Sequence, residues 1–167
     1  LQWRAVDVSD RDDALLYRLD TSSAVWKAEA NVIDVPPVPD SGLPFGLRSL
    51  AKASSYVRGG DLDFEGVTCD AVGNRYLVSE AYAAVLQVPV SGSPNWLKLP
   101  PSLVRQARAS GMLQRFNAVF EGIAINPAGD RLWLAAEREK RGLLVAHRGQ
   151  TVWGCKGGCV MLSEGGT

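Results

Sequence analysis

Phe64-Glu65-Gly66-Val67 decides the fold, because it recurs as Phe120-Glu121-Gly122-Ile123 further along the chain. The two copies begin 56 residues apart, since 120 minus 64 is 56. Each copy continues into a short apolar run, a glycine-containing turn, a second apolar run and a closing glutamate, which is Glu80 in the first copy and Glu137 in the second. A fixed period of this size is typical of repeat architectures. The sequence therefore predicts at least two copies of one β-rich unit.

Each copy also predicts a β-hairpin of its own. The turns are Ala71-Val72-Gly73-Asn74 and Asn126-Pro127-Ala128-Gly129-Asp130, and both contain residues that favour tight turns. Four apolar runs flank these turns, at residues 67–69, 75–78, 123–125 and 131–134. Because each turn lies midway between the two glutamates of its copy, folding the hairpin is expected to bring those two side chains together.

Two glutamates side by side need an explanation, because like charges on neighbouring strands are destabilising unless a cation separates them or one carboxyl is protonated. One interpretation is that Glu65 with Glu80, and Glu121 with Glu137, form a functional site. The alternative is that these side chains are solvated, or are paired with arginines. The candidate arginines are Arg115, Arg138 and Arg141.

The remaining apolar runs complete a four-strand unit, which is the blade of a β-propeller. The further strands expected are 85–90 and 96–99 in one unit, 142–147 and 151–153 in the next, and 14–20 and 24–28 in a degenerate first unit, while 159–162 is expected to open another element. One short helix is expected near 101–113, as an insertion. We predict an all-β protein, a single β-propeller domain or the N-terminal portion of one.

About three four-stranded blades fit in the 167 residues, with units at about 1–57, 58–116 and 117–167. Propellers close with roughly four to eight blades, so we expect these units to form part of a six-bladed ring. The rest of the ring would come from further chain or from self-association. The chain begins at Leu1 with no charged-then-apolar leader, which we interpret as a processed form or a fragment.

The composition excludes two classes of partner. The chain has 18 basic and 18 acidic residues, so no electrostatic footprint for nucleic acid is present. No apolar run approaches the ~20 residues needed to span a bilayer.

Cys155 and Cys159 bracket Lys156-Gly157-Gly158, a spacing that favours a disulfide over free thiols or a zinc site. A disulfide would indicate an oxidising compartment.

The glutamates that open the innermost strands of a propeller would lie at the mouth of its channel. Asp61, Asp63 and Glu65 alternate, so an extended strand would present all three on one face. Carboxylate oxygens are the ligands that Ca²⁺ and other hard cations prefer. The metal ligands predicted from this pattern are Asp61, Asp63, Glu65, Glu80, Glu121 and Glu137. An Arg115 guanidinium clamped between Glu65 and Glu121 would explain the same pattern without a cation.

Other catalytic arrangements are absent from the sequence. It contains no nucleophile elbow, no phosphate-binding loop and no dinucleotide fingerprint, and His147 is the one histidine. Any catalysis would therefore depend on carboxylates and a metal-activated water.

Four segments resemble the family called esterase-like activity of phytase, a group of secreted bacterial propeller-like proteins. They are residues 63–67, 77–80, 115–124 and 130–137, within a region from about 58 to 145. The resemblance implies a hydrolase of phosphate or other esters. It carries functional roles over to Asp63, Glu65, Glu80, Asn117, Glu121 and Glu137, and Arg115 lies in the same segment as Asn117.

Two functions follow from these observations. The first is a metal-dependent hydrolase of a small-molecule ester or phosphoester, with candidate catalytic residues Glu65, Glu80, Arg115, Asn117, Glu121 and Glu137. The second is a non-catalytic propeller in which Ca²⁺ ties the blades together while the surface binds a protein or a glycan. Both fit a secreted or periplasmic bacterial protein.

Overall fold

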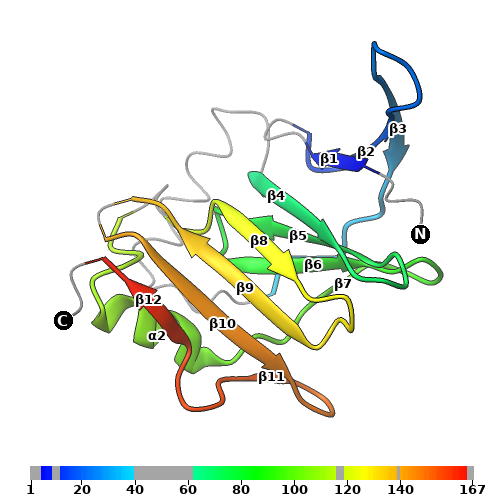
Figure 1. The fold of residues 1–167 in the computed structure, drawn as a ribbon. Helices are drawn as coiled ribbons and strands as arrows, with labels where there is room; N and C mark the ends of the chain where they lie inside the picture. The colour runs from blue at the N-terminus through cyan, green and yellow to red at the C-terminus, as the bar shows by residue number, and fades with distance from the viewer. Residues whose placement is uncertain (1–4, 9–11, 40–61, 116–118, 139, 165–167) are drawn as a thin grey trace.

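A computed structural model describes residues 5–8, 12–39, 62–115, 119–138 and 140–164. This part of the chain forms three antiparallel sheets and one short helix (Figure 1). The first sheet contains β1 (Ala5–Val8), β2 (Leu15–Asp20) and β3 (Lys27–Val32). The second contains β4 (Phe64–Cys69), β5 (Arg75–Ser79), β6 (Ala84–Val88) and β7 (Asn95–Trp96). The third contains β8 (Gly122–Ile125), β9 (Arg131–Ala136), β10 (Gly142–Arg148), β11 (Trp153–Gly154) and β12 (Val160–Ser163).

Both predicted hairpins are present. Strand β4 pairs with β5 and β8 pairs with β9, each in antiparallel register. Val67 lies opposite Leu77 in the first hairpin, and Ile123 lies opposite Leu134 in the second. Val67 and Ile123 are 56 positions apart, and Leu77 and Leu134 are 57 positions apart. The two registers are therefore equivalent apart from one additional residue in the turn of the second hairpin.

Several boundaries differ from those expected, including those of β7 and β11, which are two-residue strands. Strand β3 begins at Lys27, later than predicted, because Ser23 and the residues around it form a bend. The element predicted to open at 159–162 is present as β12, at Val160–Ser163, and it pairs with β10. The helix α2 spans Pro101–Ala109 and ends short of residue 113. Gly111 has φ of +84°, a conformation that glycine adopts readily and that ends the helix.

The sheets pack face to face in chain order. Leu16 of the first sheet is buried in one apolar cluster with Leu77 and Leu86 of the second. Tyr76 and Val78 point to the other side of the second sheet, where they join a larger core with the third sheet. Strand β4 contacts β1 on one side and β8 on the other. The second sheet therefore lies between the first and the third (Figure 1).

The glycine of the repeated motif permits a close approach of the second and third sheets. A methyl group on Gly66 of β4 would lie only 3.3 Å from Cγ2 of Ile123 on β8. A larger side chain at this position would push the two strands apart.

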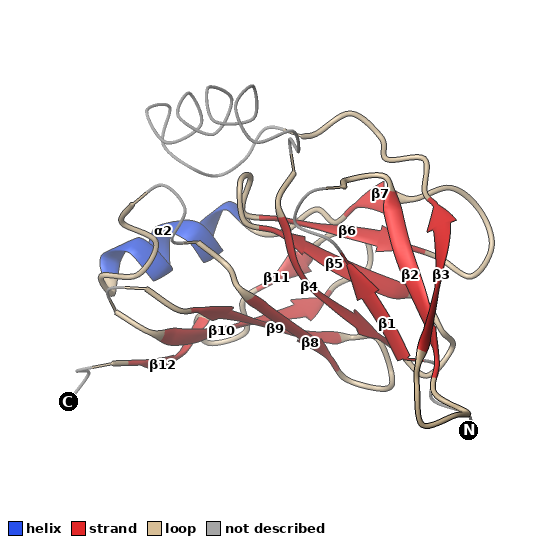
Figure 2. Cartoon of the chain, turned by 90° about the horizontal axis from the view of Figure 1, so that it is seen from above, coloured by secondary structure: helices blue, strands red, loops and turns tan. Residues whose placement is uncertain are grey.

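Helix α2 lies between the second and third sheets in sequence and fills the core beside both. Its buried residues Leu103, Val104 and Ala107 belong to the larger core. Figure 2 shows α2 on the same side of the third sheet as the second sheet. Within the described residues, no helix has the length and apolar character required to cross a membrane.

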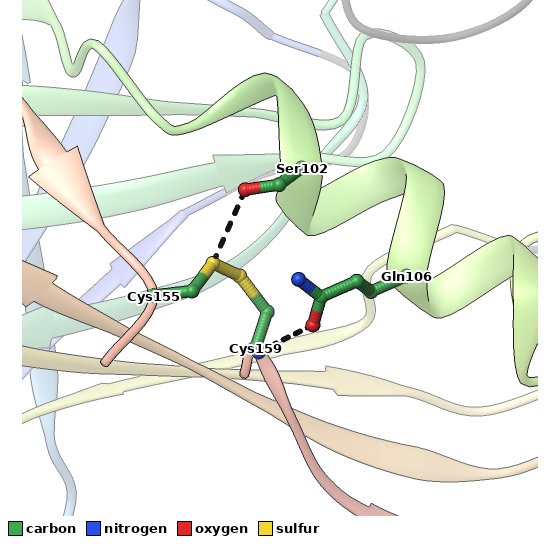
Figure 3. The surroundings of a disulfide bond; sticks show 4 residues. All are labelled: Ser102, Gln106, Cys155 and Cys159. Atoms are coloured by element: carbon green, nitrogen blue, oxygen red, sulfur yellow. Dashed lines mark hydrogen bonds between the residues drawn. A yellow bond between two sulfur atoms is a disulfide. The ribbon is translucent and has the colours of Figure 1, made fainter. Parts of the chain in front are cut away.

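The predicted disulfide between Cys155 and Cys159 is formed, with 4.9 Å between the Cα atoms. It lies against α2, as Figure 3 shows. The Cys159 amide donates a hydrogen bond of 2.7 Å to Gln106 Oε1, and the Ser102 hydroxyl lies 3.5 Å from Cys155 Sγ. The disulfide therefore closes the connection between β11 and β12 on itself, and the polar contacts with Ser102 and Gln106 hold that connection to the helix.

The first hairpin turn is organised by a buried carboxylate. Asp70 Oδ1 accepts hydrogen bonds from three backbone amides, those of Val72, Gly73 and Asn74. Its Oδ2 accepts from the Asn74 side chain at 2.8 Å and the Tyr76 hydroxyl at 3.0 Å. Burial alone would raise the pKa of Asp70, but these hydrogen bonds outweigh it and hold the pKa below its usual value. Burial and the Asp70 carboxylate together raise the pKa of Tyr76 to about 12.

We expect Asp70→Ala to lower the free energy of unfolding by about 2–4 kcal/mol, because it leaves several donors of a tight turn without their acceptor. Asp130→Ala is the matched control in the second hairpin turn, where the exposed carboxylate accepts one hydrogen bond from the Asn126 side chain. Urea unfolding of both variants measures the difference. Equal losses would show that the Asp70 network adds nothing specific.

Candidate metal centre

Three carboxylates meet where the first hairpin opens. Asp63 precedes β4, Glu65 is the second residue of β4, and Glu80 follows β5. Each offers one oxygen, and these three oxygens all lie within 4.8 Å of one another. The hairpin thus brings Glu65 and Glu80 together, as the midpoint of the turn predicts. Asp61, also expected here, lies outside the described residues.

The backbone achieves this convergence by a different route from the one expected. An extended strand would present Asp63 and Glu65 on one face by simple alternation. Instead, Phe64 lies opposite Ser79 and Gly66 lies opposite Val78, so Glu65 is the extra residue of a β-bulge. Asp63 has φ of +50°, in the left-handed region that acidic residues tolerate better than most. Bulges of this kind re-aim side chains at sheet ends.

The end of β5 is fixed to the residues before β4. The Glu80 amide donates a 3.0 Å hydrogen bond to the Asp63 carbonyl. The Ser79 hydroxyl donates to the Leu62 carbonyl, and both of these side chains are buried. The three carboxylates are therefore held by a rigid frame, not by mobile loop ends.

Glu80 is the unusual member of the group, because its side chain is 97% shielded, with a relative exposure of only 3%. Burial, together with the neighbouring Asp63 and Glu65 carboxylates, raises the pKa of Glu80 to about 7. The Val119 amide, 3.4 Å from Glu80 Oε1, and the Arg138 charge act in the opposite direction. Near neutral pH this carboxyl can therefore either hold a proton or be ionised beside a positive charge.

The glutamates of the second copy have different surroundings. Glu121 forms an ion pair with Arg138, at 3.5 Å from Oε1 to Nε. Glu137 is exposed and lines a shallow hollow with Arg138, Arg141 and Glu164. Neither Glu121 nor Glu137 belongs to the group of three carboxylates. The arginine pairing considered from the sequence therefore applies to Glu121, with Arg138 as its partner.

Arg115 and Asn117 are the two remaining candidates from the sequence. Arg115 is exposed. Asn117 lies outside the described residues. The sequence did not indicate the Val119 amide as a partner of Glu80, and no side-chain pattern could have done so, because the donor is a backbone group 39 residues away.

The donor set fits a hard divalent cation. All three groups are carboxylates, they come from a fixed bulge and strand end, and they lie close enough to share one ion. A cation would also neutralise the like charges that raise the pKa of Glu80. The residues that would hold it are Asp63, Glu65 and Glu80.

The fold and this site together define a class of protein. It is an all-β protein built from repeated hairpins that carry acidic residues at their open ends. The chain belongs to the Phytase-like family described as esterase-like activity of phytase, whose family model matches residues 4–151. The match confirms the resemblance noted over 58–145 and extends it to the first sheet. That description is of a hydrolase. Comparison with curated proteins and with solved structures gave no significant match.

The raised pKa of Glu80 predicts how the free energy of unfolding depends on pH when a chelator keeps the protein free of metal ions. Between its ordinary value of 4.5 and about 7, the folded protein binds a proton that the unfolded chain releases. Stability contributed by this group therefore falls as pH rises through that window, by roughly 3 kcal/mol. Glu80→Gln is expected to remove this slope.

Urea unfolding between pH 4.5 and 8 measures the difference, with Glu29→Gln on β3 as a matched control that keeps the wild-type slope. Parallel curves for the wild type and Glu80→Gln would contradict the assignment.

Proposed function

We propose that this protein is a metal-dependent hydrolase of a small-molecule ester or phosphoester, using Ca²⁺ or a similar hard cation. The observation that carries the proposal is the group of three carboxylates, Asp63, Glu65 and Glu80, whose oxygens lie within 4.8 Å of one another on a rigid frame. Membership of the esterase-like family supports hydrolysis as the activity.

We further propose that the three sheets are blades of a β-propeller. Their first strands, β1, β4 and β8, are neighbours in that order, as innermost strands of successive blades would be. The second sheet has the four strands of a complete blade in chain order. In this arrangement Asp63 and Glu65 open an innermost strand, which places the carboxylates at the mouth of the channel.

The chemistry of the proposed site divides between the cation and the chain. A bound hard cation supplies Lewis-acid activation of water and charge neutralisation. Glu80, with a pKa of about 7, suits a residue that takes up or releases a proton near neutral pH. Glu65 is exposed at the bulge and is accessible to a substrate. Arg138 holds Glu121 and provides positive charge near Glu80.

The candidate residues outside the carboxylate group are proposed to take part in catalysis because the family resemblance assigns them functional roles. Glu121 and Glu137 would act from the second hairpin, and Arg115 and Asn117 from the segment before it. Arg138 and Arg141, which line one hollow with Glu137 and Glu164, would be the groups that contact a negatively charged part of the substrate.

The second candidate function is a non-catalytic propeller stabilised by Ca²⁺ that binds a protein or a glycan. One observation favours it. Glu80 is almost fully buried and accepts the Val119 amide, so it joins the second sheet to the segment that leads into the third. A cation in that position would stabilise the packing of sheets without contacting a substrate.

Secretion or export to a periplasm belongs to the proposal as well. The disulfide between Cys155 and Cys159 supports an oxidising compartment, where such bonds persist.

Calcium titration by calorimetry, followed by an assay with p-nitrophenyl phosphate and p-nitrophenyl acetate, separates these functions. We expect wild-type protein to bind Ca²⁺ and Asp63→Asn with Glu65→Gln to lose at least tenfold in affinity, because two of three carboxylate ligands become neutral. Glu29→Gln is the matched control and should bind as wild type.

Hydrolysis that requires Ca²⁺ and falls with the double variant supports the hydrolase. Binding without hydrolysis of either ester supports the non-catalytic propeller. Absence of Ca²⁺ binding by the wild type would overturn the metal centre itself.

A further inference from the structure

The connection between β11 and β12 contains a reactive group that the proposed hydrolase does not use. Cys155 and Cys159 are joined by a disulfide across Lys156, Gly157 and Gly158. Gly157 has φ of +76° and Gly158 has φ of +127°, and these glycine conformations let so short a loop close. Both cysteines therefore belong to one connection, and their bond does not join one sheet to another.

The shortness of the loop limits what this bond contributes to stability. Disulfides stabilise a fold largely by restricting the unfolded chain, and the effect grows with the number of residues in the closed loop. Cys155 and Cys159 have a sequence separation of only 4, so their bond restricts the unfolded chain less than a bond that closes a long loop. Breaking it is therefore expected to leave the three sheets folded and to act on the connection itself.

The two sulfur atoms differ in their access to solvent. Cys155 is partly exposed, whereas Cys159 is completely buried, with 0% exposure. Thiol–disulfide exchange begins when a thiolate attacks an accessible sulfur atom. Lys156 is exposed and directly follows Cys155, so its charge favours the approach of an anion. An external thiolate is therefore expected to attack Sγ of Cys155 and to release Cys159.

Helix α2 supplies a partner for the sulfur of Cys155. The Ser102 hydroxyl lies 3.5 Å from Cys155 Sγ, and Ser102 belongs to the first turn of α2 (Figure 3). A hydroxyl donor and the positive end of a helix both stabilise negative charge on a sulfur atom. A neutral sulfur is a weak acceptor, so the contact with Ser102 becomes stronger when Cys155 is a thiolate.

The backbone of Cys159 couples the disulfide to β12. Its amide donates a 2.7 Å hydrogen bond to Gln106 Oε1, and its carbonyl accepts a 2.7 Å hydrogen bond from the Val145 amide. Gln106 lies on α2 and Val145 lies on β10, so Cys159 is bonded to both elements directly before β12 begins at Val160. The start of β12 is therefore held by a residue that the disulfide constrains.

The other end of β12 reaches the shallow hollow that Glu137 lines. Glu164 directly follows β12, and its amide donates a 2.7 Å hydrogen bond to the Arg141 carbonyl. The Arg141 amide in turn lies 3.3 Å from Glu164 Oε2, and both residues line the hollow. Only the 4 residues of β12, Val160–Ser163, separate Cys159 from Glu164. A change at the disulfide is therefore transmitted through one short strand to the wall of the hollow.

We propose that the bond between Cys155 and Cys159 is redox-responsive, and that low-molecular-weight thiols open it in the folded protein. Opening releases the connection from α2 and loosens β12 together with Glu164. This inference goes beyond the proposed hydrolase and does not depend on it.

The exchange takes two steps. A thiolate RS⁻ attacks Cys155 Sγ, the sulfur–sulfur bond breaks, and Cys159 leaves with the electron pair and takes up a proton. A second thiolate then attacks the RS sulfur of the mixed disulfide and displaces the Cys155 thiolate, which is protonated in turn. Two molecules of RSH become RSSR, and the protein gains two electrons and two protons.

Alkylation followed by mass spectrometry tests whether the bond opens in the folded state. A Cys69→Ser background removes the free thiol. We expect about 5 mM reduced glutathione to convert most of this protein from no alkylated cysteine to two, with an unchanged far-ultraviolet circular dichroism spectrum. A bond that stays closed until denaturant is added would overturn the inference.

Hydrogen exchange tests the coupling to β12. In the reduced protein we expect the amides of residues 159–164 to exchange about fivefold faster than in the oxidised protein, while residues 75–88 of the second sheet keep their rates. Cys155→Ser combined with Cys159→Ser should reproduce the reduced pattern without any thiol present. Equal rates at residues 159–164 in the two redox states would overturn the coupling.

Ser102→Ala tests the role assigned to the helix. Iodoacetamide should alkylate Cys155 of the reduced variant about threefold more slowly than in the reduced Cys69→Ser parent, because the hydroxyl no longer stabilises the thiolate. Ser110→Ala, at the other end of α2, is the matched control and should keep the parent rate. Equal rates for all three proteins would contradict the role of Ser102. None of these measurements involves Ca²⁺ or ester hydrolysis, so the inference and the proposed function can fail separately.

Discussion

The close approach of β4 to β8 is the constraint on which the rest of the structure depends. Gly66 and Ile123 come so near that a methyl group on the glycine would contact the isoleucine at 3.3 Å. With these strands adjacent, Tyr76 and Val78 are buried against Leu132 and Leu134, and the segment before β8 passes beside Glu80. The same glycine follows Glu65, so the motif that sets the sheet spacing also carries a ligand of the candidate site.

The two hairpins share a register but have different electrostatics. In the first, a bulge at Glu65 and a left-handed Asp63 bring three carboxylates together beside a buried Glu80. In the second, Arg138 pairs with Glu121. The repeat supplies the same scaffold twice, and the residues beside each hairpin give its glutamates different electrostatic surroundings.

Much of this architecture could be predicted from the sequence, because the turn and strand residues of each hairpin are adjacent in the chain. The turn position alone placed Glu65 beside Glu80. The bulge was not predictable, since it depends on how Phe64 and Gly66 pair across the hairpin and not on alternation. The strand β12 could be expected from the apolar run 159–162, but its pairing with β10 could not, because a strand pattern does not specify a partner.

The position of the site could be predicted from the sequence, but its electrostatics could not, because the electrostatics depend on burial. Glu80 follows a strand in the sequence like any other terminal glutamate, and its burial beside the Val119 amide arises only in the folded protein. Exclusion of water strengthens the repulsion between neighbouring carboxylates. The buried carboxyl then strongly favours binding a proton or a cation. The chemical character of the site therefore arises from the contact between repeats, although every one of its carboxylates belongs to a single repeat.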